Sequence, residues 1–190
     1  MRIGLLGGSF DPPHNGHLLV AGDACIALRL DRLLFIPAAT QPLKVGQAGA
    51  SPQQRLAMVS RLLDGEAGME LNAMEIERGG LSYTVDTLTA LAAQHPGSDL
   101  FWLVGADVTR SFAKWRSPER IVELATLVVL QRTDAVPDLS GLPGNSQRLA
   151  TRRIDISSTE IRRRVQEGKS IRGFVPDSVA DFIASEGLYR

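Results

Sequence analysis

The residues best suited to chemistry lie in one short segment near the amino terminus, residues 7–17. Its sequence is Gly7-Gly8-Ser9-Phe10-Asp11-Pro12-Pro13-His14-Asn15-Gly16-His17. Adjacent glycines allow a ligand to approach the backbone closely. His14 and His17 stand at the expected start of a helix, where both imidazoles can lie beside its positive end. This combination is typical of a phosphate-binding site.

The same segment has two plainer interpretations. It could be a turn whose histidine caps a helix, or Asp11, His14 and His17 could bind a metal ion. Both are disfavoured, because two of the chain's 3 histidines share one turn with Gly-Gly and Asp-Pro, and no further His or Cys is there to complete a metal site. The segment is neither a dinucleotide-binding GxGxxG, since the third glycine is missing, nor a Walker loop.

A second candidate anion site lies toward the carboxyl terminus. Residues 145–172 include eight basic and three acidic side chains, a local net charge of +5 in a chain with no net charge. Ser157, Ser158 and Thr159 offer hydroxyls and backbone N–H groups at an expected helix start. Arg162 follows one turn later and can contact the same anion, which a triphosphate would fit. The neighbouring basic residues are interpreted as a solvated face: Arg163, Arg164 and Lys169.

Such a basic segment also raises nucleic-acid binding as a rival function. Single-strand binders interleave aromatic stacking residues with their basic groups, and no aromatic residue lies between Trp115 and Phe174. The whole chain has 21 basic and 21 acidic residues, so no overall field would attract nucleic acid or anionic lipid. We expect no nucleic-acid partner.

Length and composition are those of one globular domain. The chain has 190 residues, 44% hydrophobic and 22% charged, which predicts one domain over residues 1–190. The single cysteine, Cys25, excludes an internal disulfide. The amino-terminal apolar run is too short for a signal peptide, and no stretch reaches the ~18 apolar residues of a membrane span. We therefore expect a cytoplasmic protein with no membrane contact.

The elements that must position these residues alternate along the chain. Short apolar runs predict strands within 3–6, 33–36, 69–76, 100–104, 126–130 and 152–156. Amphipathic runs predict helices over 18–29, from Ser51, from Val85 to before Pro96, from Ser117, over 158–167 and from Pro176. This alternation predicts an α/β fold. We expect a single doubly wound, Rossmann-like, mostly parallel sheet with helices on both faces, a small carboxyl-terminal helical segment, and a site in loops that follow strands.

Some local features are specific enough to be tested. Ser51, Pro52 and Gln54 form a capping-box pattern at a helix start. The region between Thr133 and Arg148 predicts an exposed loop. The apolar face of the first helix is expected to consist of Leu18, Leu19, Gly22, Cys25, Ile26 and Arg29.

Residues 7–17 resemble the (T/H)xGH signature of the nucleotidyltransferase superfamily, whose members transfer adenylyl and cytidylyl groups. Phosphopantetheine adenylyltransferases and nicotinate mononucleotide adenylyltransferases share much of that signature. Other segments resemble the nicotinate enzymes, in order and spacing, over the whole chain. They are Ile36-Pro37-Ala38, Pro42-Leu43-Lys44, Ser82-Tyr83-Thr84-Val85-Asp86-Thr87-Leu88, Gly105-Ala106-Asp107 with Trp115, and Ile156-Ser157-Ser158-Thr159-Glu160-Ile161-Arg162.

This resemblance implies adenylyl transfer from ATP to nicotinate mononucleotide, with Mg²⁺ held mainly by the ATP phosphates and no metal ligand from the protein. The residues expected to stabilise charge are His14, His17, Lys44 and Arg162. The residues expected to contact ATP are Gly8, Ser9, Phe10, Gly16, Gly105, Asp107, Ile156, Ser157, Ser158 and Thr159. Nicotinate would be bound by Tyr83, Thr84 and Trp115.

Without the resemblance, some of these residues have plainer roles. Lys44 would be a surface lysine, Thr84 a helix N-cap and Trp115 a core residue. Asp107, at the end of a strand, has the position expected of a ribose-hydroxyl acceptor.

Two positions depart from the family pattern, and two other functions stay open. Leu43 stands where the family often has His, and Gln131 begins a run where it often has an Arg pair or Cys-Arg-Arg. The alternatives are the same transfer to another acceptor, such as phosphopantetheine, and a non-enzymatic module that binds nucleotides or nucleic acid. The sequence leaves homo-oligomer formation open.

Overall fold

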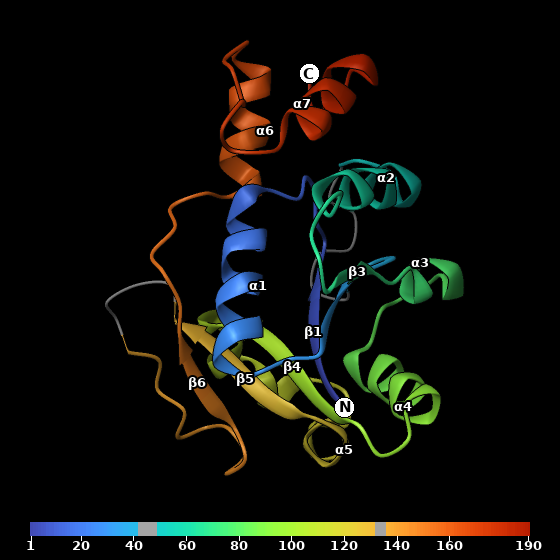
Figure 1. Cartoon of the computed structure of the whole chain (residues 1–190), viewed down its shortest axis with the longest axis vertical. Helices are drawn as coiled ribbons and strands as arrows, with labels where there is room; N and C mark the ends of the chain where they lie inside the picture. Colours follow the sequence, from blue (N-terminus) through green and yellow to red (C-terminus); the bar gives the residue numbers. More distant parts are fainter. Residues whose placement is uncertain (42–48, 132–135) are drawn as a thin grey trace.

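The computed structural model describes residues 1–41, 49–131 and 136–190. Within these ranges, six strands form one parallel sheet in the order β3-β2-β1-β4-β5-β6 (Figure 1). The strands are β1 (Arg2–Gly8), β2 (Arg32–Pro37), β3 (Met69–Leu71), β4 (Asp99–Gly105), β5 (Thr126–Gln131) and β6 (Gln147–Ala150). The predicted α/β fold with a parallel sheet is confirmed.

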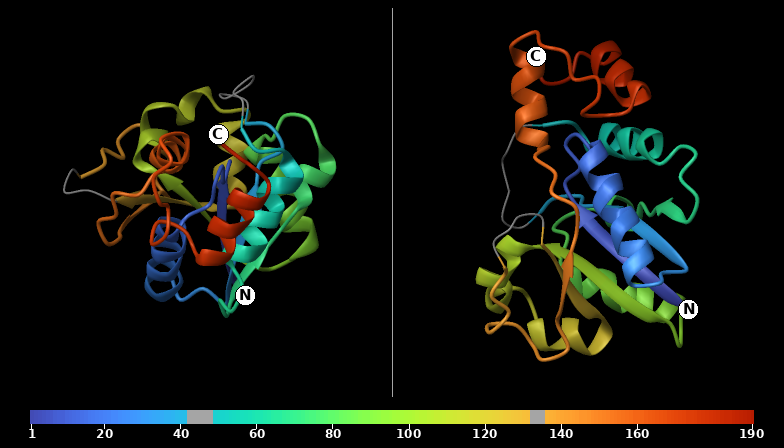
Figure 2. Two further views of the ribbon diagram at one scale, coloured as in Figure 1. Left: turned by 90° about the horizontal axis from the view of Figure 1, so that it is seen from above. Right: turned by 60° about the vertical axis from the view of Figure 1, so that its left-hand side comes forward.

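Helices connect these strands and cover both faces of the sheet (Figures 1 and 2). The α-helices are α1 (Asn15–Ala27), α2 (Pro52–Leu62), α3 (Met74–Arg78), α4 (Thr84–Gln94), α5 (Pro118–Leu124), α6 (Ser158–Gln166) and α7 (Asp177–Ser185). Two 3-10 helices, η2 (Ala106–Arg110) and η3 (Phe112–Lys114), follow β4. As predicted, a small helical segment ends the described chain: α6 lies beyond the upper end of α1, and α7 packs beside α2 (Figure 1).

Side chains alternate between two cores because successive strand residues point to opposite faces. Leu103 of β4 belongs to the core beneath α1, α2, α6 and α7, whereas its neighbours Trp102 and Val104 belong to the core beneath α4 and α5. In the described residues, no helix is both long and apolar enough to cross a membrane.

The predicted buried face of α1 is correct at Leu18 and Cys25, which pack against the core, and wrong at Leu19, Ile26 and Arg29. Val20, Ala21 and Ala24 are buried, whereas Leu19 is 38% and Ile26 is 80% exposed. Alanines let the helix axis approach the sheet closely, so small residues fill this interface and the larger apolar side chains are left outside. Cys25 is half-buried and packs against the core.

The last strand also differs from the prediction. β6 covers Gln147–Ala150, and the predicted strand at 152–156 is absent from the described residues. Arg152 instead donates from its backbone N (2.9 Å) and Nη2 (2.8 Å) to the carboxylate of Asp23 in α1. These contacts hold the segment that follows β6 against α1 and away from the sheet edge.

Other local predictions have mixed outcomes. Ser51 and Gln54 form the expected capping box, with Gln54 N 3.2 Å from Ser51 Oγ and Ser51 N 2.9 Å from Gln54 Oε1. The weak strand expected within 69–76 is limited to β3, and the helix α3 was missed. Thr84 is the first residue of α4 rather than its N-cap, which is Tyr83.

Strand order locates the site. β1 lies between β2 and β4 in the sheet. The connection after β1 leads to β2 on one side and the connection after β4 leads to β5 on the other, so the two connections run in opposite directions. Ligands of open α/β sheets bind at such a switch point, outside the carboxyl ends of the strands. The loop after β1 and residues 105–110 after β4 meet this condition.

Candidate active site

The two histidines of the first loop are packed together at the amino end of α1. Their ring centroids are 3.7 Å apart and the rings are tilted by 31°. The His14 backbone N donates to Nδ1 of His17 (3.1 Å), and the Phe10 ring lies at 5.0 Å from the His17 ring. An imidazole that accepts at Nδ1 carries its proton on Nε2, so His17 can donate from that nitrogen.

Gly16 allows this packing. A Cβ atom at residue 16 would lie 2.9 Å from Nδ1 of His14 and 3.2 Å from Cγ2 of Ile154. His14 is itself buried, at 3% exposure. The glycine of the signature is therefore required by the fit of the His14 ring against the start of α1.

Arg55 of α2 fixes the loops that leave β1 and β2. Its guanidinium donates to the carbonyl oxygens of Ser9 (2.8 Å), Ala38 (2.6 Å) and Ala39 (3.0 Å). Burial lowers the pKa of Arg55, while the negative charge of Asp11 acts in the opposite direction. An arginine at this depth stays charged, so it satisfies three carbonyls with one rigid fork.

Sequence reasoning missed Arg55, although one signal was available. Arg55 lies four residues before Val59, on the buried face of α2. A charge on an apolar helix face needs partners inside the protein. That pattern alone could have predicted that the Arg55 side chain forms hydrogen bonds inside the protein.

Arg55→Lys should therefore destabilise the fold. Lysine keeps the charge but cannot reach three carbonyl groups in one plane, and each buried carbonyl left without a donor is costly. We expect a loss of about 2 kcal/mol or more in unfolding free energy, which is roughly 4–8 °C in Tm for a chain of this size. Thermal unfolding checks this, with Arg61→Lys on the same helix as a control. An equal Tm for the two variants would contradict the role given to Arg55.

The structure brings the second predicted anion site against the first. Ser158 Oγ donates to the carbonyl oxygen of Pro12 (2.8 Å), and Nη1 of Arg162 donates to that of Asp11 (2.7 Å). Ser157 is the N-cap of α6 and accepts from the backbone N of Glu160 (3.1 Å). The amino ends of α1 and α6 thus flank one loop, and both favour anions.

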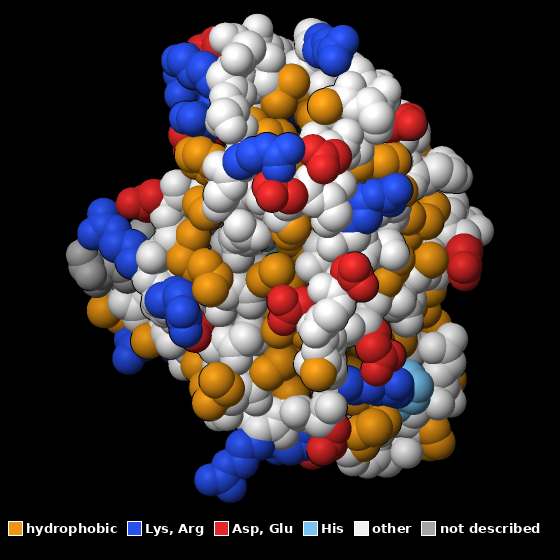
Figure 3. Space-filling model, turned by 45° about the horizontal axis from the view of Figure 1, so that its top comes forward, with side chains coloured by type: hydrophobic (Ala, Val, Ile, Leu, Met, Phe, Trp, Pro, Cys, Tyr) orange, Lys and Arg blue, Asp and Glu red, His pale blue; other side chains and the backbone are white. Residues whose placement is uncertain are grey.

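The other basic residues of this region are largely paired with acidic ones. Figure 3 shows Lys and Arg interspersed with Asp and Glu on the face that it presents. Ion pairs join Arg152–Asp23, Arg163–Glu167, Lys169–Glu167, Arg172–Asp177 and Arg172–Asp181. The local excess of +5 is therefore not an open basic stripe of the kind that tracks a nucleic-acid backbone.

Arg164 differs from the predicted solvated face. Its guanidinium lies 4.5 Å from the centre of the Phe174 ring, and Nε donates to the carbonyl oxygen of Ser170 (2.9 Å). It joins α6 to the segment before α7. Arg163 and Lys169 are exposed, as predicted.

Residues after β4 form the third side of the site. Gly105 ends β4, and Asp107 is exposed in η2. A Cβ at residue 105 would lie 2.5 Å from Oδ1 of Asp107, so the glycine leaves room for that carboxylate. Ile156, by contrast, is half-buried against the core near α1.

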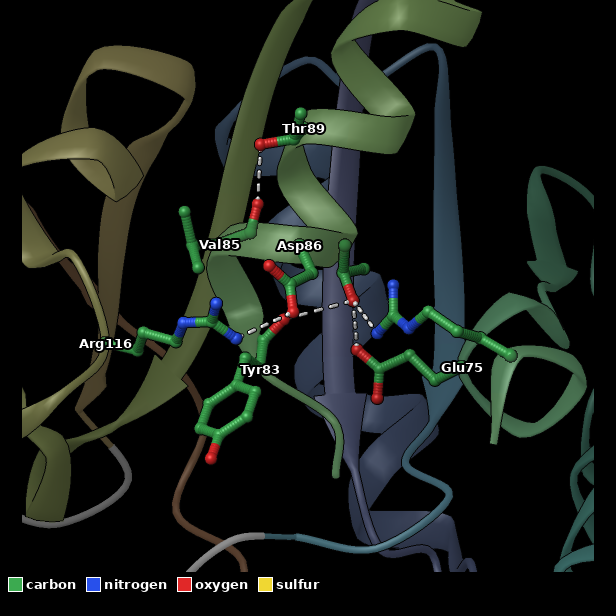
Figure 4. A network of polar contacts seen from close by, with 8 residues as sticks. Glu75, Tyr83, Val85, Asp86, Thr89 and Arg116 are labelled. Atoms are coloured by element: carbon green, nitrogen blue, oxygen red, sulfur yellow. Dashed lines mark hydrogen bonds and ion pairs between the residues drawn. The ribbon is translucent and has the colours of Figure 1, made fainter. Parts of the chain in front are cut away.

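The predicted nicotinate residues lie around the start of α4. Cζ of Arg116 is 4.8 Å from the centre of the Tyr83 ring, and its Nη1 is 3.4 Å from Oδ2 of Asp86 (Figure 4). Trp115, the residue before Arg116, is half-buried, with its ring 5.6 Å from that of Phe112. Arg116 thus connects the end of η3 with the start of α4, a link that sequence reasoning missed.

A buried acid supports the approach to α4. Glu75 of α3 is 4% exposed and accepts from the Thr87 hydroxyl (2.6 Å), to which Arg78 also donates (3.1 Å) (Figure 4). Burial raises the pKa of Glu75, and hydrogen bonds from Thr87 and Ser82 oppose this shift. Ser82 also accepts from the backbone N of Ala39 (2.9 Å), so the start of α4 is tied to the loop after β2.

A pocket of about 270 Å³ opens between the loops that follow β1 and β2. Ser9, Asp11, Thr40, Ala50 and Arg55 are among the residues that line it. The predicted phosphate-contacting Lys44 and the departure at Leu43 lie outside the described residues. Gln131, the other departure, is the last residue of β5.

Comparison with known proteins defines the class of this site. The sequence model of the cytidylyltransferase-like family matches residues 5–164. The fold matches that of a solved structure, "Plasmodium falciparum nicotinic acid mononucleotide adenylyltransferase complexed with NaAD", with a TM-score of 0.82 over 99% of this chain and 97% of that one, at 18% identity. The chain is therefore a nucleotidyltransferase of the cytidylyltransferase-like family.

Closer relatives identify the family within that class. The chain is 53% identical to a probable nicotinate-nucleotide adenylyltransferase of Gemmatimonas aurantiaca, over 100% of this chain and 93% of the relative. It is 43% identical to the protein of that name from Thermus thermophilus, over the full length of both. The chain belongs to the nicotinate-nucleotide adenylyltransferase family.

Proposed function

We propose that this chain transfers the adenylyl group of ATP to nicotinate mononucleotide, forming nicotinate adenine dinucleotide and pyrophosphate. The observation that carries the proposal is the direct contact of α6 with the first loop, through Ser158 and Arg162. It brings two candidate anion sites, each predicted separately, together around one loop, as a reaction between a polyphosphate and a second phosphate requires.

The reaction needs no nucleophile from the protein. An ionised phosphate oxygen of the mononucleotide attacks the α-phosphorus of ATP, and the bond from that phosphorus to the bridging oxygen of pyrophosphate breaks. Catalysis is then positioning and stabilisation of spread negative charge. We assign charge stabilisation to His14, His17, Lys44 and Arg162, with His17 donating from Nε2 and His14 packed against it.

Binding of ATP falls to the loop after β1 and the start of α6. Gly8, Ser9, Phe10 and Gly16 shape the loop. The backbone N–H groups of Ser157, Ser158 and Thr159 lie at the amino end of α6, where they can bind phosphate. Asp107, with Gly105 beside it, accepts from a ribose hydroxyl, and Ile156 sets the position of Ser157.

Mg²⁺ would be carried mainly by the substrate. Among the residues that the structure describes, no group of three or more His, Cys, Asp or Glu side chains is placed to hold a metal ion. Mg²⁺ commonly binds through substrate phosphates and keeps several waters, so we expect the ion to arrive with ATP and to neutralise part of its charge.

The nicotinate carboxylate is assigned to the amino end of α4. The backbone N–H groups there favour an anion, with the Thr84 hydroxyl and Tyr83 beside them and Trp115 stacking on the ring. Asp86 in the first turn of α4 would repel an anion, but Arg116 pairs with it (3.4 Å) and offsets that charge.

One experiment separates the candidate functions. The protein is incubated with ATP and Mg²⁺ and either nicotinate mononucleotide, phosphopantetheine or no acceptor, and pyrophosphate release is measured. We expect release only with the mononucleotide. Release with phosphopantetheine would move the proposal to another acceptor. No release with either, combined with salt-dependent retention of oligonucleotides, would favour a binding module instead.

Arg162→Ala should weaken ATP binding by about tenfold or more, because a charge-assisted contact is lost. Arg163→Ala is the matched control, since Arg163 is 62% exposed and pairs only weakly with Glu167 at 3.7 Å. Calorimetry with a non-hydrolysable ATP analogue measures both. Equal affinities for the two variants would remove Arg162 from the triphosphate site.

A further inference from the structure

The carboxylate of Asp11 is held on the side of the loop where α2 begins. Its Oδ1 accepts from the Tyr189 hydroxyl (2.6 Å) and from the backbone N of Ala50 (3.0 Å). A Cβ at residue 49 would collide with Oδ2, so Gly49 leaves room for the second oxygen. The Asp11 carboxylate is therefore engaged by protein groups.

Tyr189 reaches this position from the far end of the sequence. It lies after α7, packs against the core and has a φ of 63°, a left-handed conformation that non-glycine residues rarely adopt. Its hydroxyl also lies 4.0 Å from Sδ of Met58 in α2. Packing and the short hydrogen bond to Asp11 hold the residue there against the cost of that backbone conformation.

The backbone of the loop is anchored by α2 and α6, and the residue that begins α1 is anchored by the segment before α7. Arg55 holds the carbonyl of Ser9, Arg162 that of Asp11 and Ser158 that of Pro12. The Asn15 backbone N donates to the carbonyl oxygen of Phe174 (2.9 Å). These anchors act on the backbone, whereas Tyr189 and Ala50 hold the Asp11 side chain.

We propose that Tyr189 is a positioning residue, whose hydroxyl fixes Asp11 and thereby the loop of residues 9–13 that leads to the two histidines. This inference rests on the proposed function, because it concerns the rate of adenylyl transfer. Without the hydroxyl, Asp11 would keep only the contact with Ala50, and the loop would lose its link to the segment after α7.

The surroundings of the Tyr189 hydroxyl favour its protonated form, which is the form that donates to Asp11. Burial raises the pKa of the Tyr189 hydroxyl far above its ordinary value, and the hydrogen bond to Asp11 raises it further. The hydroxyl thus stays protonated and can donate. The positive charges of Arg55 and Arg162 lower the pKa of Tyr189 and so oppose the effect of the negatively charged Asp11 carboxylate.

Tyr189→Phe tests the proposal because it keeps the ring and removes only the hydroxyl. We expect kcat to fall by about 10- to 100-fold, as for a small misplacement of catalytic groups, with both KM values little changed and Tm lowered by only several degrees, because one hydrogen bond is lost. Ser178→Ala is the matched control, since it removes a hydroxyl contact between α7 and the Arg61 carbonyl of α2 (3.4 Å) away from the loop. It should leave kcat unchanged.

A double-mutant cycle shows whether Tyr189 acts through Asp11. Asp11→Ala, which removes the oxygen that accepts from Tyr189, should lower kcat, and the double variant should be no slower than the slower single variant, because both single variants remove the same hydrogen bond. The proposal would be overturned if the double variant lost kcat by the product of the two single losses, or if Tyr189→Phe kept the wild-type kcat.

Hydrogen exchange gives a readout that does not depend on turnover. Tyr189→Phe should speed amide exchange in residues 9–17 and leave α4 unchanged. Unchanged exchange in residues 9–17 would overturn the positioning role, even if the wild-type protein used another acceptor. Inactive wild-type protein with nicotinate mononucleotide would instead count against the proposed function alone.

Discussion

His17→Ala should lower kcat by on the order of 10²-fold or more, with much smaller changes in either KM. The donor on Nε2 gains most when negative charge gathers around the α-phosphorus, so its loss raises the barrier more than it weakens binding. The Phe10 ring at 5.0 Å and the His14 ring at 3.7 Å hold the His17 ring in this position. Steady-state kinetics with each substrate varied in turn measures the effect.

His95→Ala is the control for this variant. His95 contacts Arg32, the first residue of β2, at the end of the sheet away from the site. It should retain the wild-type kcat. A His17→Ala enzyme within a few-fold of wild-type kcat would show that His17 does not act on the transition state.

The second large effect is the preference for nicotinate mononucleotide, which carries a carboxylate, over nicotinamide mononucleotide, which carries a neutral amide. We expect kcat/KM for nicotinate mononucleotide to exceed that for nicotinamide mononucleotide by at least roughly tenfold. The amide would turn its NH₂ group toward a backbone donor at the start of α4, leaving a buried N–H unpaired, and would lose the attraction of an anion to the helix end. Parallel kinetics with the two mononucleotides gives the ratio.

Two variants locate the source of that preference. Thr84→Ala should reduce the ratio, mostly by harming the acid, and it leaves the helix cap intact because the N-cap is Tyr83. Trp115→Ala should harm both substrates about equally, since either ring can stack. A Thr84→Ala enzyme with the wild-type ratio would mean that the carboxylate binds elsewhere.

The predictable parts of this structure are those that local signals specify. Gly-Gly and two histidines between an apolar run and a helical pattern located the first loop, and Ser51 with Gln54 located the start of α2. Alternating apolar runs were enough for the parallel sheet. In each case the decisive residues are close together in the sequence.

The parts that could not be predicted depend on distant partners. The segment after β6 is held by the pairing of Arg152 with Asp23, and the loop after β1 is held by Arg55 and Tyr189. Most of the fully buried residues of α1 are small, so a search for large apolar side chains wrongly included Leu19 and Ile26 in the buried face. The two candidate anion sites were predicted separately, and only folding shows that Arg162 reaches the Asp11 carbonyl.

The most direct test follows the α-phosphorus itself. The protein is incubated with Mg²⁺, nicotinate mononucleotide and ATP radiolabelled at the α-phosphorus, and the products are separated. Adenylyl transfer by attack on that phosphorus predicts label in nicotinate adenine dinucleotide, an equal amount of unlabelled pyrophosphate and no labelled protein. Label that stays on the protein, or ATP consumed without labelled dinucleotide, would contradict the account.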